Sequence, residues 1–278
     1  MSEKINNVQE LKAKAKQMRQ IILKTSPLGY GAHVPSALSA TDLVAALYFH
    51  TMNFDPQNLK MANRDRFLLS AGHKCLVQYA ALNLLGILSD EELKTWEGFQ
   101  SNLAGHPCYG KCPGVEASTG SLGHGFAMAN GMALAAKMDN TGSRVFTILG
   151  DGELAEGSNW EAAMFASKYQ LDNLVAIADC NNMSTVYPLD DSMPLLDLKA
   201  KFQAFGFAVK EINGNKMEEI VEALDALPFE KGKPNAIVAH CVKGCGVPSI
   251  INKPKFHATM WNDQMVADAL KALDEYEF

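Results

Sequence analysis

The residues best suited to bind a ligand follow two apolar runs near the middle of the chain, residues 145–149 and 174–178. The first run leads directly to Asp151 between two glycines, and the second leads to a polar turn that contains Asn181. One carboxylate and one amide oxygen beside bare glycine backbone suit a hard divalent cation such as Mg²⁺, which also holds phosphate oxygens. The pair therefore indicates a site for a metal ion and phosphate groups.

The elements around this pair must bring the two side chains together. Each apolar run predicts a buried strand, and the segment 157–169 between them predicts an amphipathic helix. A right-handed strand–helix–strand unit places both strands parallel, with their carboxyl ends at the edge of the sheet where α/β proteins bind ligands. We therefore expect Asp151 and Asn181 to lie side by side.

Alternating strands and helices continue through the rest of the chain. This pattern predicts an α/β fold in which helices cover both faces of a parallel sheet. With no linker or repeat in the sequence, we expect a single domain over 1–278. Further strands are expected over 67–70, 207–212 and 235–239, and helices over 8–25, from 39 onward, 73–86, 89–96, 127–137, 194–205, 217–227 and after 257.

Composition narrows the functional classes. Hydrophobic residues make up 47% of the 278 positions and charged residues 20%, which is ordinary for a globular protein. A net charge of −6 gives no electrostatic reason to expect nucleic acid or an anionic membrane as partner. No apolar run approaches a membrane span and the N-terminus is polar, so we expect neither a signal peptide nor a membrane segment, and a cytoplasmic location.

The six cysteines are expected to be reduced thiols. A four-thiolate zinc site from Cys108, Cys112, Cys241 and Cys245 is an alternative, but both pairs have three intervening residues instead of the usual two. Four histidines, in contrast, stand on loops or at turns, where their imidazoles are available to a site. They are His33, His73, His106 and His257.

With these residues in place, the chain resembles the N-terminal, diphosphate-binding part of transketolase over nearly its whole length. The resemblance implies a thiamin-diphosphate-binding fold and a ketol transferase that uses thiamin diphosphate (ThDP) and a divalent metal. The matching pieces are RDRFLLSAGH (64–73), AGHP (104–107), PGVEASTGSLGHG (113–125), GDGELAEG (150–157), WEAAM (160–164), LDNL (171–174), FGF…EINGN (205–215) and KGCG (243–246).

The resemblance also implies roles for individual residues. Asp151, Asn181 and the backbone carbonyl of Met183 would bind Mg²⁺, or Ca²⁺ or Mn²⁺ in its place. The four histidines would line the channel above the thiazolium, and Glu156 would belong to a carboxylate relay between two active sites. The residues implied to contact the cofactor are Gly120, Ser121, Leu122, Gly150, Asp151, Gly152, Glu153 and Asn181.

Two departures from the family pattern bear on function. Around His33, at His124 and in the loop after Asn181 the sequence differs from the usual motifs, so the sugar substrates of other transketolases do not transfer to this chain. The sequence also ends at Phe278, where the family continues into a pyrimidine-binding domain. We therefore expect a split enzyme, whose second chain carries that domain in an α2β2-like assembly.

Three other interpretations compete with this one. The α-subunit of a 2-oxo-acid dehydrogenase shares the metal-binding pattern, but the motifs at 64–73 and 120–125 favour transketolase. A non-catalytic ThDP-binding protein would have no need to keep four channel histidines. A dinucleotide site at the glycines of 120–125 lacks both a strand directly before them and a suitably spaced acidic residue.

Overall fold

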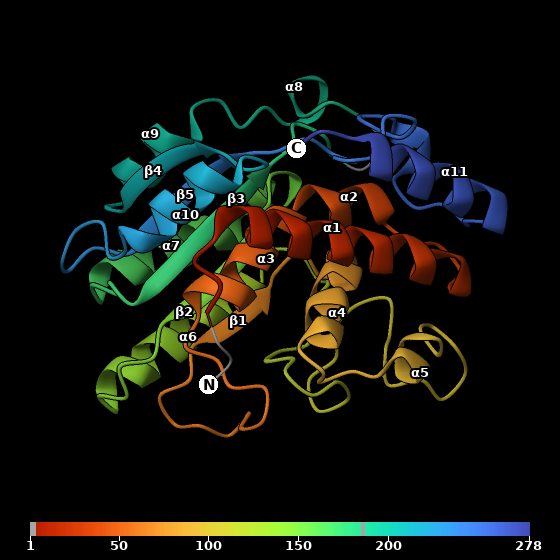
Figure 1. Cartoon of the computed structure of the whole chain (residues 1–278). Helices are drawn as coiled ribbons and strands as arrows, with labels where there is room; N and C mark the ends of the chain where they lie inside the picture. Colours follow the sequence, from red (N-terminus) through yellow and green to blue (C-terminus); the bar gives the residue numbers. More distant parts are fainter. Residues whose placement is uncertain (1–3, 185–186) are drawn as a thin grey trace.

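Five parallel strands form one sheet in the order β1-β2-β3-β5-β4. The structure is a computed structural model that describes residues 4–184 and 187–278 (Figure 1). The predicted parallel α/β architecture is confirmed, and the strands begin and end close to the apolar runs of the sequence. They are β1 (Arg66–Leu69), β2 (Val145–Gly150), β3 (Leu174–Cys180), β4 (Ala208–Asn213) and β5 (Asn235–His240).

Helices cover both faces of the sheet (Figure 1). Successive β2 residues alternate between two buried clusters, with Ile148 packing under α1 to α4 and α10, and Leu149 under α6, α7 and α9. The α-helices are α1 (Val8–Thr25), α2 (Val34–Ser39), α3 (Thr41–Ala46), α4 (Cys75–Leu84), α5 (Asp90–Leu93), α6 (Gly125–Met138), α7 (Gly157–Lys168), α8 (Leu189–Ser192), α9 (Leu198–Ala204), α10 (Met217–Asp225) and α11 (Asp263–Glu275).

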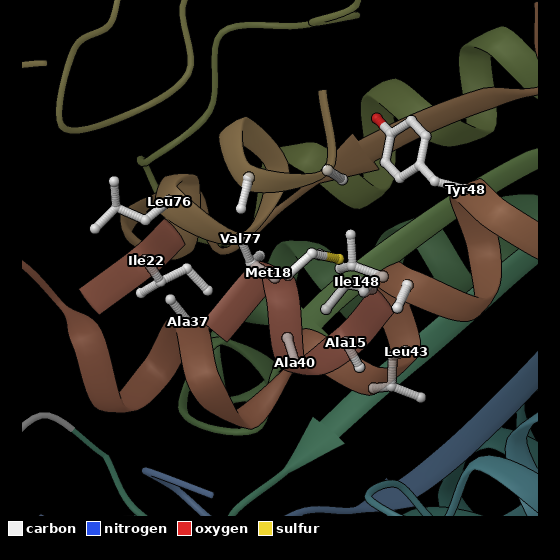
Figure 2. Close-up of a cluster of buried hydrophobic side chains, with 14 of the residues drawn as sticks. Ala15, Met18, Ile22, Ala37, Ala40, Leu43, Tyr48, Leu76, Val77 and Ile148 are labelled. Atoms are coloured by element: carbon white, nitrogen blue, oxygen red, sulfur yellow. The ribbon is translucent and has the colours of Figure 1, made fainter. Parts of the chain in front are cut away.

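Helix α1 shows how the sequence pattern becomes packing. Asn7 caps its first turn by accepting hydrogen bonds from the backbone of residues 9 and 10. Its apolar residues recur at helical spacing, and Met18 and Ile22 are fully buried. Figure 2 shows them beside Ala37 of α2, Val77 of α4 and Ile148 of the sheet. Within the described residues, no helix is both long and apolar enough to cross a membrane.

One predicted helix boundary is wrong, and one helix was not expected. The helix expected from residue 39 is α3, which begins at Thr41. The unexpected helix is α2, which begins at Val34 with Pro35 in its first turn, where the missing N–H costs no hydrogen bond. The helix expected over 194–205 begins only at Leu198, where the Asp197 side chain caps the backbone of Ala200. The short helix α8 lies within the segment that was expected to be a loop.

A buried ion pair joins α1 to α3. The Arg19 guanidinium donates to both carboxylate oxygens of Asp42, at 2.9 and 2.6 Å, and its Nε donates to the backbone carbonyl of Cys245. The arginine side chain is fully buried. These contacts tie the first helix to the loop after β5, which forms part of the cavity described below.

We expect Asp42→Ala to lower the free energy of unfolding by about 3–5 kcal/mol, because it leaves a buried guanidinium without its counter-charge. The matched control is Glu91→Ala, which breaks the exposed pair with Lys94 and should leave the free energy of unfolding almost unchanged. Denaturant unfolding of both variants would measure the difference. Equal losses of unfolding free energy in the two variants would show that the buried pair stabilises the fold no more than the exposed pair does.

Candidate active site

A cavity of about 280 Å³ opens at the carboxyl edge of the sheet. Segments far apart in the sequence form its walls: the start of α2, the turn after β1, the loops before α6 and after β2, and the loops after β3 and β5. The residues that line it are His33, Ser36, His73, Lys74, His106, Gly120, Leu122, Gly150, Asp151, Gly152, Glu153, Asn181, Met183, Ser184, Lys243 and His257.

Asp151 lies in the floor of this cavity and is only 4% exposed. Its carboxylate accepts hydrogen bonds from the backbone N–H groups of Gly152 at 2.8 Å and Asn182 at 2.6 Å. Burial, followed by the nearby charge of Asp179, raises the pKa of Asp151 to about 6. A bound cation would favour the ionised carboxylate and so offset this cost.

Asn181 is buried on the next strand, as the strand–helix–strand unit requires. Its Nδ2 faces Ser39 Oγ and Asp179 Oδ1, each at 3.4 Å, while its Oδ1 is buried without a hydrogen-bond partner. An orphaned amide oxygen next to a buried carboxylate is an arrangement that fits a hard cation. Met183 lines the same cavity. The residues present therefore fit a metal ion bound through oxygen atoms.

The cysteines and histidines of the described residues do not form a metal site. Across residues 4–184 and 187–278, no group of three or more His, Cys, Asp or Glu side chains is arranged to hold a metal ion. The alternative zinc site from Cys108, Cys112, Cys241 and Cys245 therefore does not form as a cluster. A cation at Asp151 would depend on one carboxylate, one amide oxygen and backbone carbonyl oxygens.

A buried ion pair that the sequence did not predict lies at the cavity, where Lys74 is one of the lining residues. Lys74 Nζ donates to Asp179 Oδ2 at 2.5 Å, and Ser39 Oγ donates to Asp179 Oδ1 at 2.6 Å. Burial alone would lower the pKa of Lys74, but the charge and hydrogen bond of Asp179 raise it. The only local signals were the placement of Lys74 directly after His73 and of Asp179 at the end of an apolar run.

The four predicted histidines lie close together and form one wall of the same cavity. The ring centroid of His33 lies 5.1 Å from that of His73, 5.0 Å from that of His257 and 6.5 Å from that of His106. Burial lowers the pKa of His33 to about 4 and that of His257 to about 3, and it brings the pKa of His73 well below its usual value. At neutral pH these three imidazoles are therefore uncharged.

Lys243, which the sequence analysis named only within a motif, belongs to this wall. Its Nζ lies 3.2 Å from His257 Nδ1 and also donates to the carbonyl of Ser184. Because an ammonium group only donates, Nδ1 is the acceptor and His257 carries its proton on Nε2. Burial, and next the charge of Lys74, lower the pKa of Lys243 to about 8.

The remaining predicted residues divide between the cavity and the surface. Gly120 has a φ of +136°, and a Cβ there would lie 2.6 Å from the His106 ring, so only glycine fits. The Glu153 carboxylate accepts from Ser70 Oγ and from two backbone N–H groups, and thereby joins three loops. Ser121 and Glu156 are exposed and do not line the cavity.

This α/β domain, with a polar cavity at the carboxyl edge of its sheet, has the fold of solved ThDP-dependent enzymes. It superposes on transketolase from Leishmania mexicana with a TM-score of 0.88 and 30% identity, over 95% of this chain and 41% of that one. Transketolase from Campylobacter jejuni gives a TM-score of 0.86 at 31% identity, over 98% and 43%. The chain therefore spans less than half the length of these enzymes.

Sequence comparison gives the family. The model described as "Transketolase, thiamine diphosphate binding domain" matches residues 12–275, and the chain belongs to the transketolase family. It is 37% identical to one of the subunits of an apulose-4-phosphate transketolase from Actinobacillus succinogenes, over 96% of both chains. It is 38% identical to "6-deoxy-6-sulfo-D-fructose transketolase subunit SqwG" of a Clostridium species, over 96% of this chain and 97% of that one. The resemblance stated from the motifs is confirmed.

We expect Asp151→Ala and Asn181→Ala each to abolish Mg²⁺-dependent ThDP binding while the chain stays folded. Asn181→Ala should lower the melting temperature only slightly, because its Oδ1 has no protein partner to lose and its Nδ2 makes only two long contacts, each at 3.4 Å. Asp151→Ala removes the acceptor for two backbone N–H groups and should cost about 1–3 kcal/mol. Calorimetric titration that found wild-type cofactor affinity in both variants would contradict this assignment.

Proposed function

We propose that this chain is the diphosphate-binding subunit of a two-chain transketolase, which moves a two-carbon ketol unit from a ketose to an aldose. The observation that carries the proposal is one cavity lined by two chemically different groups of residues. One group is a buried carboxylate with an orphaned amide oxygen, and the other is a cluster of uncharged histidines. The family match favours this function over a 2-oxo-acid dehydrogenase subunit or a non-catalytic protein.

The floor would hold the cofactor through its metal. Asp151, Asn181 and the carbonyl of Met183 would bind Mg²⁺, or Ca²⁺ or Mn²⁺, and the glycines on either side of Asp151 leave room for a diphosphate beside it. When bound, the thiazolium of ThDP supplies the electron sink that cleavage of a ketose between C2 and C3 needs. At the cavity floor, the residues of this chain would bind the metal and the diphosphate and so orient the cofactor.

The histidine wall would bind sugar hydroxyls and carry protons. An uncharged imidazole can donate a hydrogen bond from one nitrogen and accept one at the other, so it can pass a proton between sugar oxygens. His257, held by Lys243 at Nδ1, would donate to a substrate oxygen through Nε2. Lys243 also places a positive charge in the cavity, which lowers the pKa of His33 and of His257.

The exposed residues of α7 favour a contact between this helix and a second chain. Glu156 stands at its N-terminus in solvent, and Met164 and Phe165 expose 55% and 37% of their surface. We propose that this face, with the small residues of α6, meets a second subunit that carries the pyrimidine-binding domain. In an α2β2-like cytoplasmic assembly, Glu156 would then serve as the carboxylate relay between active sites. The relatives named as subunits support a partner of this kind.

We expect His73→Ala and His106→Ala to keep ThDP binding but to lower turnover by about 10²–10⁴-fold, the usual contribution of a positioned proton-transfer group. Both residues line the cavity, and neither is among the residues assigned to the metal. His240→Gln is the control, because His240 is exposed and bonded to Glu211 outside this cavity. Normal steady-state rates in either alanine variant would remove that histidine from the mechanism.

We also expect the purified chain to show no ketol transfer with ThDP, Mg²⁺ and a panel of ketose and aldose phosphates. It would hold the diphosphate but leave the pyrimidine ring without an activating carboxylate. Addition of the partner chain should restore turnover. If the chain by itself turned over at about 1 s⁻¹ or faster, an ordinary enzymatic rate, the split-enzyme proposal would be wrong.

A further inference from the structure

The amide of Asn181 can offer a cation either its oxygen or its NH₂ group, and only the oxygen can bind. The two groups have nearly the same size and shape, so sterics alone do not choose between them. The residue is only 7% exposed and lies against Ser39 at the end of α2 and Asp179 on β3. The choice therefore depends on which of these neighbours can donate and which can accept.

Both neighbours present acceptors to Asn181. Ser39 has one hydroxyl proton, and it donates this proton to Asp179 Oδ1 at 2.6 Å, so only oxygen lone pairs remain for the amide. Asp179 also acts as an acceptor, because its two carboxylate oxygens accept from Lys74 Nζ at 2.5 Å and from Ser39 Oγ at 2.6 Å. The Nδ2 group of Asn181 faces these two oxygens at 3.4 Å each. A flipped amide would place its oxygen against both of them.

We propose that Lys74, Asp179 and Ser39 form a positioning network that fixes Asn181 with its oxygen toward the cation. The proposal rests on the proposed function, since it takes Asn181 as a metal ligand. Lys74, in the turn between β1 and α4, and Ser39 both donate hydrogen bonds to Asp179. Because the Ser39 proton is used in this way, the Ser39 oxygen can only accept from Asn181. The unpartnered Oδ1 of Asn181 is the result.

The same network sets the charge of the site. In the β2–β3 register Asp179 is paired with Gly150, so Asp151 comes directly after the residue opposite Asp179. Lys74 neutralises Asp179, so Asp151 is the carboxylate left to face a cation. This explains why one of two neighbouring buried acids serves as a ligand and the other as a support. It also explains why a buried lysine lies at a cation site.

The test compares Mn²⁺ affinity at saturating ThDP, measured by electron paramagnetic resonance on the full chain. The main variant is the double substitution Lys74→Met with Asp179→Asn, which removes the pair together and leaves the net charge unchanged. Since neither charge is left buried alone, the chain should fold. We expect Mn²⁺ affinity to fall about 10- to 100-fold, as for other residues that orient metal ligands, with ThDP affinity preserved at saturating metal.

Ser39→Ala provides a second, smaller change, with an expected loss of about tenfold in Mn²⁺ affinity. Its matched control is Ser26→Ala, which removes an equally buried hydroxyl that donates to Leu23 far from the cavity, and which should leave Mn²⁺ affinity unchanged. Near-normal Mn²⁺ affinity in Lys74→Arg, which keeps the positive charge beside Asp179, would support the network.

Wild-type Mn²⁺ affinity in both the double variant and Ser39→Ala would overturn the positioning role, even if their melting temperatures fell, while the proposed function would stand. Failure of the unaltered chain to bind Mn²⁺ with ThDP would instead overturn the proposed function, and the positioning role with it.

Discussion

The structure depends on how two buried carboxylates are accommodated at one edge of the sheet. The parallel register of β2 and β3 brings Asp151 and Asp179 close together in a place that water scarcely reaches. Asp179 is neutralised by Lys74, whereas Asp151 accepts backbone N–H groups on the cavity floor. Because an isolated buried charge is costly, Asp151 is the carboxylate of this pair that a bound cation would stabilise.

Close backbone approach builds the cavity around that edge. A Cβ at Gly72 would lie 2.7 Å from the carbonyl of Thr119, so the turn after β1 and the loop before α6 touch only because residue 72 has no side chain. The Glu153 carboxylate then fastens the same loops through Ser70, Gly123 and Gly150. Rigid walls of this kind allow four imidazoles to converge although they lie on four separate segments.

The two walls differ in electrostatic character for physical reasons. Burial and neighbouring lysines disfavour the protonated forms of His33, His73 and His257, so these three imidazoles stay uncharged near neutral pH. The floor contains the carboxylate of Asp151 and the unpartnered amide oxygen of Asn181. One wall is therefore suited to a metal and phosphates, and the other to sugar hydroxyls and protons, which is the division of labour that a transketolase requires.

The sequence alone determined the parallel α/β fold, the adjacency of Asp151 and Asn181, and the family, because strand-ending motifs and their spacing are local properties of the chain. It could not determine the role of Lys74, Asp179, Ser39 or Lys243. The partners in the Ser39–Asp179 contact are separated by 140 residues, and a serine at a helix end or a lysine after a histidine has no pattern of its own. The tertiary structure also showed that Glu156 is exposed and outside the cavity, which its sequence motif could not reveal. Propensity and periodicity act over a few residues, whereas burial and charge pairing are decided only when distant segments meet.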